Sequence, residues 1–269
     1  MNLQTRRTDM RSTILSFLLF CVAWPALAAE EARVAVASNF TGTMQQLVQR
    51  FEQQNPYHVV ASYGSTGKLF AQITNGAPFD AFLSADVESP SRLEAMGLIT
   101  SGSRFTYARG ELVLWSPSVR SADEVLALLK SGAFRYLAMA NPKTAPYGAA
   151  AEEVLTKLGL DRRYAQQTVQ GDNIAQTFQF VHSGNAQLGF VARSQMLSAE
   201  ATPSGAVWEI PLEMYAPIEQ QAVLLKRGAE NTAARAFLDF LRSKQAREII
   251  AASGYGIAMP SLAASTLEK

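Results

Sequence analysis

The chain has little of the two residue types on which many metal sites and nucleophilic enzymes depend. Its 269 residues include one cysteine and two histidines. Cys21 lies in an apolar stretch that we expect export to remove, which excludes disulfides, thiolate catalysis and cysteine-ligated metals from the mature protein. His58 and His182 form no His-x-x-x-His pair, and no Walker loop or dinucleotide fingerprint is present. We therefore expect no cofactor and no bound metal cation.

An excess of charge of one sign is also lacking. The chain has 24 Lys and Arg against 23 Asp and Glu, for a formal net charge of +1. A near-neutral balance does not indicate binding to nucleic acid or to an anionic membrane surface. The hydrophobic share of 48% is typical of a folded globular protein with a sizeable core.

The N-terminus has the pattern of a secretory signal peptide. Arginines at positions 6, 7 and 11 precede an apolar run, 14–24, and an A-x-A cleavage site lies in the segment 25–29 (PALAA). The apolar run is shorter than the roughly 20 residues that a membrane span needs. We expect residues 1–28 to be removed and the mature protein to be periplasmic. Whether the arginine pair directs twin-arginine export stays open.

Two short polar turns carry the clearest functional signal. Ser38 and Asn39 follow the apolar run 34–37, and the Gly-Ser-Thr-Gly turn 64–67 follows a second apolar run. Each turn reads as the end of a strand and the start of a helix, where free N–H groups and the positive end of the helix dipole favour anions. Ser, Thr and Asn add donors without charge, although they are also common as simple helix N-caps. The pair of turns predicts capture of a small oxyanion.

The order of elements predicts an α/β fold with two lobes, each a mostly parallel sheet flanked by helices. Short apolar runs alternate with amphipathic segments along the whole chain. We expect the first lobe to hold 29–108 and 218–269 and the second to hold 109–217, with extended crossings near 106–114 and 215–223. Strands are expected at 33–37, 57–62, 81–84, 112–116, 137–140, 168–170, 188–191 and 221–226. Helices are expected at 43–54, 68–75, 88–96, 121–130, 149–158, 173–183 and 231–243, the last continuing into 245–253.

Eight segments, in order along the chain, resemble the periplasmic molybdate-binding proteins of ABC transporters. They are 36–43 (VASNFTGT), 63–67 (YGSTG), 75–86 (NGAPFDAFLSAD), 103–107 (SRFTY), 112–115 (LVLW), 141–148 (NPKTAPYG), 188–192 (LGFVA) and 252–256 (ASGYG). The resemblance implies the two-lobed periplasmic-binding-protein fold, with a ligand cleft between the lobes. It also implies that the ligand is molybdate or tungstate, bound through its oxygens and not as a metal cation.

The resemblance further implies five ligand-binding residues. Ser38 and Asn39 stand in the first turn, and Thr66 stands in the second, where serine is more usual. Tyr147 and Ile174 would each contribute a backbone N–H group. A tyrosine that one subgroup of the family carries after the 188–191 strand is absent here, since Ala192 stands near that place.

The same resemblance implies a monomer that delivers its ligand to the membrane permease of an ABC transporter. Two other classes stay open. A sulfate or thiosulfate receptor differs mainly in the size of its ligand, which sequence does not measure. An exported phosphatase or sulfatase using Ser38 or Ser65 would need a base within reach, and the spacing supplies none. Asp80 and Asp86 flank a strand, but acids beside a dianion would repel it, so we do not interpret them as a metal pair.

Overall fold

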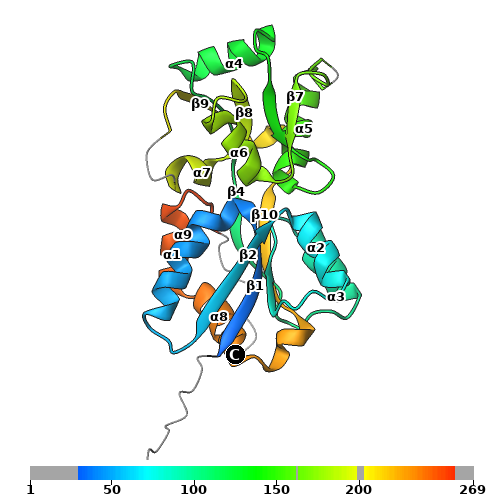
Figure 1. Ribbon diagram of the computed structural model, residues 1–269, viewed down its shortest axis with the longest axis vertical. Coiled ribbons are helices and arrows are strands. Elements are labelled where there is room, and N and C mark those ends of the chain that lie inside the picture. Colours follow the sequence, from blue (N-terminus) through cyan, green and yellow to red (C-terminus); the bar gives the residue numbers. More distant parts are fainter. Residues whose placement is uncertain (1–29, 162, 199–202, 258–269) are drawn as a thin grey trace, which may run out of the picture.

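The computed structural model describes residues 30–161, 163–198 and 203–257, so the expected signal peptide lies outside it. Two five-stranded sheets, each flanked by helices, are stacked along the long axis of the molecule (Figure 1). We call the lobe built on the sheet β2-β1-β3-β10-β4 the first lobe and that built on β7-β6-β8-β5-β9 the second lobe. The two-lobed α/β fold expected from the sequence is confirmed.

The first lobe combines the N-terminal part of the chain with its C-terminal part. In its sheet β1 runs parallel to β2 and β3, whereas β10 is antiparallel to β3 and β4. Its strands are β1 (Glu31–Ala37), β2 (His58–Gly64), β3 (Ala81–Leu83), β4 (Phe105–Gly110) and β10 (Ile218–Leu224). Its helices are η1 (Ser38–Phe40), α1 (Thr41–Glu52), α2 (Thr66–Thr74), α3 (Glu88–Ala95), η3 (Lys226–Glu230), α8 (Thr232–Leu241) and α9 (Lys244–Ala252).

Alternation along β1 explains why this sheet is covered on both faces. Val34 and Val36 pack with residues of α1, α8 and α9, and Ala35 between them packs with residues of α2 and α3. Successive side chains of a strand point to opposite faces, so the run 34–37, which is apolar at every position, is buried on both sides. The continuous apolar run of β1 therefore fixes it in the middle of a three-layer lobe.

The second lobe is continuous in sequence between β4 and β10. In its sheet β6 runs parallel to β7 and β8, whereas β5 is antiparallel to β8 and β9. Its strands are β5 (Leu112–Ser116), β6 (Leu137–Ala140), β7 (Thr168–Gly171), β8 (Leu188–Ala192) and β9 (Ala206–Glu209). Its helices are α4 (Ala122–Ser131), α5 (Pro146–Lys157), α6 (Ile174–His182), α7 (Arg193–Ser198) and η2 (Leu212–Met214).

Several elements differ from the sequence-based expectation. The crossing near 106–114 consists of two strands, β4 and β5, and neither β4, β9 nor α7 was expected as a separate element. The C-terminal helix is interrupted at Ser243, whose side chain accepts a hydrogen bond from Ala246 N and caps α9 as a new helix. Helix α5 begins three residues earlier than expected, at Pro146. Proline is favoured at the first position of a helix because an N–H group there would have no partner within the helix, so its absence costs nothing.

The early start of α5 depends on a close approach at Gly148. A Cβ atom at this position would lie 2.3 Å from the carbonyl oxygen of Ala140, the last residue of β6. Glycine therefore lets the first turn of α5 rest directly on the end of β6, which brings the backbone N–H of Tyr147 to the junction between the lobes. Among the described residues, no helix combines the length and the apolar character needed to cross a membrane.

We predict that Gly148→Ala destabilises the protein by about 1–3 kcal/mol or more, because the new methyl group meets fixed backbone. Urea unfolding followed by circular dichroism measures the change. Ala149→Ser is the matched control, since it also adds one heavy atom, at the neighbouring half-buried position, and should change stability by less than about 0.5 kcal/mol. Equal stability of Gly148→Ala and wild type would contradict the close approach.

Candidate functional site

A small cavity lies between the lobes where four helices begin. It is bordered by the starts of η1, α2, α5 and α6, two helices from each lobe. Its lining residues are Ala37, Ser38, Asn39, Gly64, Ser65, Thr66, Ala85, Ala145, Pro146, Tyr147 and Ile174. The strands β1 and β2 lead directly to it and β6 reaches it through the segment 141–145, as expected for α/β sheets, in which ligands bind beyond the carboxyl ends of the strands.

The electrostatics of this cavity come from the backbone. None of its lining residues carries a charged side chain. The first N–H groups of a helix have no partner within the helix, and an α-helix start carries about half a positive charge from the aligned peptide dipoles. The starts of α2, α5 and α6, together with the N–H groups of the short helix η1 that leads into α1, give the cavity a positive potential without a fixed cation.

In the first turn, the side-chain amide of Asn39 is directed away from the cavity. Its side-chain nitrogen donates to Gln220 Oε1 at 2.9 Å and to Tyr255 Oη at 3.1 Å, which directs the amide into the protein interior. The backbone N–H of Asn39 remains at the start of η1, beside the hydroxyl of Ser38. Both residues are buried and line the cavity, so little of either is exposed to bulk water.

The second turn presents two hydroxyl groups. Thr66 Oγ1 accepts a hydrogen bond from Ala85 N at 3.0 Å, which leaves its own proton free to be donated. Ser65, the N-cap residue of α2, makes no side-chain capping bond, and its buried Oγ has no hydrogen-bond partner among the described residues. A buried hydroxyl without a partner costs about 1–3 kcal/mol, so a polar ligand at this place would relieve that cost.

The second lobe supplies backbone donors. Tyr147 is the second residue of α5, directly after Pro146, which has no N–H. Ile174 is the first residue of α6, whose N-cap Asn173 accepts a hydrogen bond from Gln176 N. In both helices an N–H group at the start therefore borders the cavity and has no partner within its own helix.

Three buried phenols stay neutral: Tyr147 lines the cavity, and Tyr107 and Tyr255 lie behind it, hydrogen-bonded to Gln220 and Asn39. Burial raises the pKa values of Tyr107 and Tyr147 well above the ordinary value of 10, and it also raises the pKa of Tyr255. Desolvation disfavours the phenolate, so these groups add no negative charge near the site at any physiological pH.

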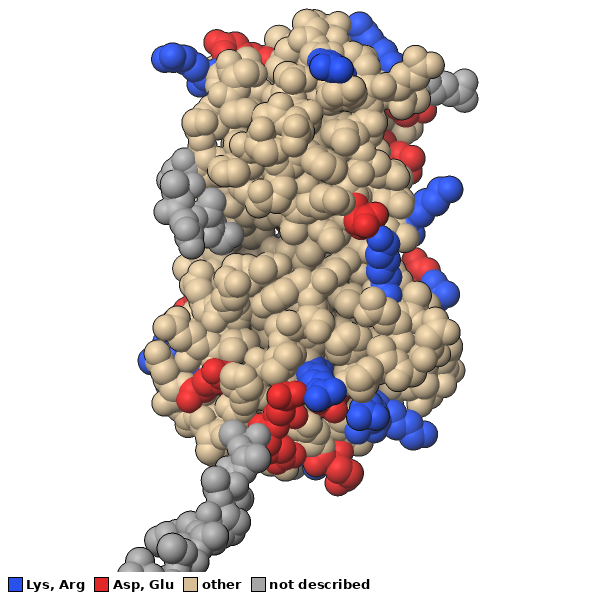
Figure 2. Space-filling view, in the orientation of Figure 1, with Lys and Arg blue, Asp and Glu red and all other residues tan. Residues whose placement is uncertain are grey.

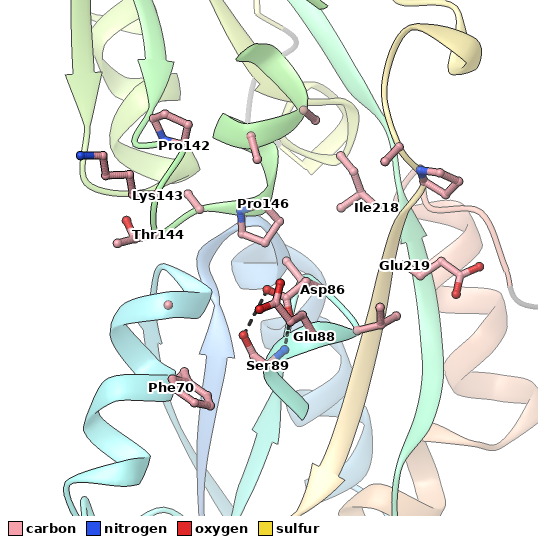
Figure 3. A pocket seen from close by; sticks show the side chains of 18 of the residues that line it. Phe70, Asp86, Glu88, Ser89, Pro142, Lys143, Thr144, Pro146, Ile218 and Glu219 are labelled. Carbon is pink, nitrogen blue, oxygen red and sulfur yellow. Dashed lines mark hydrogen bonds between the residues drawn. The ribbon is translucent and has the colours of Figure 1, made fainter. Parts of the chain in front are cut away.

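A larger cleft of about 560 Å³ adjoins the cavity and shares Ala85, Ala145 and Pro146 with it. Figure 3 shows this cleft between the segment from Pro142 to Pro146 of the second lobe and the start of α3 in the first. In the face drawn in Figure 2 the waist between the lobes is largely without charged side chains, which gather towards the two ends and along one edge.

The two aspartates that flank β3 have structural partners. Asp86 Oδ1 accepts from Ser84 Oγ and from Ser89 N, and Asp86 Oδ2 accepts from Ser89 Oγ (Figure 3). Asp80 accepts from the backbone N–H of Arg33 at 2.8 Å. In the part of the chain that the structure describes, no cluster of three or more potential metal-ligating side chains occurs.

The lobes touch beside the cavity. Gly67 N, in the second residue of α2, donates to Thr144 O of the second lobe at 2.9 Å. Lys68 Nζ lies 2.9 Å from an oxygen of Asp172, just before α6. These contacts hold the starts of α2, α5 and α6 around one volume.

The structure thus brings together the five residues that the sequence suggested: Ser38, Asn39, Thr66, Tyr147 and Ile174. Their role in binding stays a prediction. Sequence reasoning did not choose Ser65 as a donor, although it precedes Thr66 in the same turn. It also missed the buried partners of Asn39, because Gln220 and Tyr255 lie 181 and 216 residues away in sequence.

Known proteins match this chain over nearly all of the residues that the structure describes. The family model of bacterial extracellular solute-binding proteins matches residues 32–256. The molybdate-binding protein ModA of Azotobacter vinelandii is 48% identical over 240 residues, which cover 89% of this chain and 94% of the relative. ModA of Rhodobacter capsulatus is 44% identical over 238 residues, covering 88% and 92%. The solved structure of the Azotobacter vinelandii periplasmic molybdate-binding protein matches with a TM-score of 0.79 at 42% identity, covering 85% of this chain and 100% of that one. This chain therefore belongs to the bacterial extracellular solute-binding protein family.

Proposed function

We propose that the protein captures molybdate, and also tungstate, between its two lobes and delivers it to the membrane permease of an ABC transporter. The observation that carries the proposal is the convergence of four helix starts and three neutral hydroxyl groups on a cavity whose lining bears no charge. Helix N-termini are common anion sites, and here two come from each lobe.

A shell of donors alone favours an oxyanion that carries no proton. Molybdate and tungstate accept hydrogen bonds at neutral pH and donate none. Phosphate carries protons near neutral pH and needs an acceptor, and no carboxylate lines the cavity. A hydrolase would in addition need a base within hydrogen-bond reach of its serine, and no histidine, lysine or acid is among the lining residues.

The relatives support molybdate over sulfate. The two relatives named as molybdate-binding proteins are 48% and 44% identical to this chain over about nine-tenths of its length. Sulfate has the same charge and the same tetrahedral shape as molybdate but is smaller. A receptor therefore discriminates between the two anions by how far apart it holds its hydrogen-bond donors.

We propose specific roles for the lining residues. Ser38 and Thr66 donate from their hydroxyl groups, and Asn39, Tyr147 and Ile174 donate from their backbone N–H groups. Ser65 is a sixth candidate, because its hydroxyl is buried without a partner. Hydrogen bonds to charged groups contribute about 1.5–3 kcal/mol each, so a shell of this kind binds tightly without a counter-charge.

Capture involves closure of the first lobe (expected at 29–108 and 218–269) against the second (expected at 109–217), with the first crossing after Gly110, where β4 ends. An anion that bridges donors of both lobes binds the closed form better than any open one, and it therefore shifts the population towards closure. We further propose that residues 1–28 direct export, that the mature protein is a periplasmic monomer, and that the closed form is what the permease receives.

Isothermal titration calorimetry with molybdate, tungstate, sulfate, thiosulfate and phosphate tests the ligand. We expect tight binding of molybdate and tungstate. Sulfate should bind at least about tenfold more weakly, which corresponds to roughly 1.4 kcal/mol. Tight sulfate binding with no molybdate signal would identify the protein as a sulfate receptor instead.

The second turn is tested by single hydroxyl deletions. We expect Thr66→Ala and Ser65→Ala each to weaken molybdate binding about tenfold or more, since each removes a hydrogen bond to a charged ligand. Thr66→Ser is the control, because it keeps the hydroxyl and should keep the affinity.

The thermal stability of the ligand-free variants distinguishes the structural roles of the Ser65 and Thr66 hydroxyl groups. Ser65→Ala should leave the melting temperature unchanged or raise it, because it removes a buried hydroxyl without a partner. Thr66→Ala should lower it, because it leaves Ala85 N without its acceptor. Unchanged affinity in Ser65→Ala would remove that residue from the site, and unchanged affinity in Thr66→Ala would remove the other.

Closure is tested by small-angle X-ray scattering with and without molybdate. We expect the radius of gyration to fall when ligand is added. Identical scattering curves with and without ligand would count against closure.

The ion pair between the lobes is tested by Lys68→Ala, which removes the contact with Asp172. We expect molybdate binding to weaken by no more than about fivefold, since exposed ion pairs contribute roughly 0.2–1 kcal/mol. The effect should shrink in high salt.

A further inference from the structure

A buried hydrogen-bond network joins the two sides of the candidate site behind its lining. At its centre is the side chain of Gln220, on β10, which has no exposed surface. Its Oε1 accepts from Asn39 Nδ2 at 2.9 Å and from Tyr107 Oη at 3.0 Å. Its Nε2 donates to Tyr147 Oη at 3.2 Å.

The two outer members of this network also carry proposed ligand donors. Asn39 is in η1 of the first lobe and Tyr147 is in α5 of the second, and both backbones border the cavity. Tyr255 Oη donates to the carbonyl oxygen of Asn39 at 2.7 Å, which further fixes this turn. One amide side chain therefore connects, through buried contacts, a donor residue of each lobe.

The network lies at the crossing between the lobes. A Cβ atom on Gly110, the last residue of β4, would lie 2.1 Å from Tyr147 Oη and 2.7 Å from Gln220 Nε2. Strand β10 begins at Ile218, only two residues before Gln220, and its register against β4 shifts between Gln220 and Gln221. The phenol of Tyr147 thus contacts both strands through which the chain passes from one lobe to the other.

Glutamine is suited to this place because it both accepts and donates. Two donors, from Asn39 and Tyr107, face its oxygen, so its nitrogen is directed at Tyr147. An apolar side chain would leave several buried polar groups without partners, and a carboxylate would place a charge beside an anion site.

We propose that Gln220 is a positioning residue for ligand capture: it sets the distance between the Asn39 and Tyr147 backbone donors in the closed form. The inference rests on the proposed function for the identity of the ligand. Gln220 does not touch the anion. It acts by holding the N-terminal turn of α5 against the turn formed by Ser38 and Asn39, so that closure presents both backbone donors in one fixed geometry. Loss of the network makes the closed form less populated and the ligand quicker to leave.

Tyr147→Phe tests the inference most cleanly, because it removes the phenol oxygen and keeps the ring and the backbone donor. We expect molybdate to bind about tenfold more weakly, as for a lost buried hydrogen bond whose partner is left unpaired. The change should lie mainly in a faster dissociation rate, measured by stopped-flow mixing with excess tungstate.

Tyr164→Phe is the matched control. Tyr164 is also a buried tyrosine of the second lobe, and its hydroxyl donates to Leu129 O, away from the cavity. The control variant should lose a similar amount of thermal stability and keep the molybdate Kd within about twofold. A merely structural role for the Tyr147 phenol would make the two variants alike.

Gln220→Met is the second variant, with Gln221→Met as its control. Gln221 is the next residue of β10, and its side chain bonds instead to Thr106 Oγ1 and Arg104. We expect weaker binding and faster dissociation in Gln220→Met only. Wild-type Kd and dissociation rate in both Tyr147→Phe and Gln220→Met would overturn the inference.

A ligand-free measurement separates this inference from the proposed function. Nitroxide labels at Gln72→Cys on α2 and Asp123→Cys on α4, both exposed positions, report the distance between the lobes in a protein that begins after residue 28 and so lacks Cys21. Without ligand, Tyr147→Phe should broaden the distance distribution, and Tyr164→Phe should not. If wild type binds none of the five anions, the proposed function fails while this comparison still decides the role of Gln220. Equal distributions in Tyr147→Phe and wild type would overturn it.

Discussion

The need to satisfy backbone N–H groups at helix starts is the constraint on which the rest of the structure depends. Four helices begin around one cavity, and their first N–H groups have no partner within the helix. Protein groups satisfy some of them, as when Gly67 donates to Thr144 across the lobes. The others border the cavity, where only a hydrogen-bond acceptor would satisfy them. Fold and function are linked here, because the same parallel strands that build each core deliver these helix starts to one place.

Much of this arrangement could be predicted from the sequence. Alternating apolar runs and amphipathic segments gave the two α/β lobes, because hydrophobic periodicity is a local signal. Ser38 and the turn that contains Thr66 are recognisable because polar helix-start residues follow closely on apolar runs of strand-like sequence. The start of α5 was placed three residues late, since the sequence signal at Pro146 is weaker than the alanine-rich helix that follows it.

The rest depends on contacts between distant segments. Which atom of Asn39 faces the cavity is decided by Gln220 and Tyr255, which lie far along the chain and occupy its side chain. The unpartnered hydroxyl of Ser65 is visible only once its surroundings are known, because the sequence marks it as an ordinary helix cap. Gly148 and Gly110 similarly owe their identity to close approaches between elements that sequence patterns treat as independent.

A site without counter-charge makes geometry the main determinant of affinity. A lysine or arginine in the cavity would attract any anion over a range of positions, whereas a hydrogen bond weakens steeply when its distance or angle changes. Discrimination between dianions of equal charge therefore rests on how rigidly the donors are spaced. Four of the six proposed donors, Asn39, Thr66, Tyr147 and Ile174, have a side-chain contact to a second element or begin a helix packed on a sheet. Such rigid spacing, relaxed only by parting of the lobes, is what a protein needs if it must both select a dianion and release it.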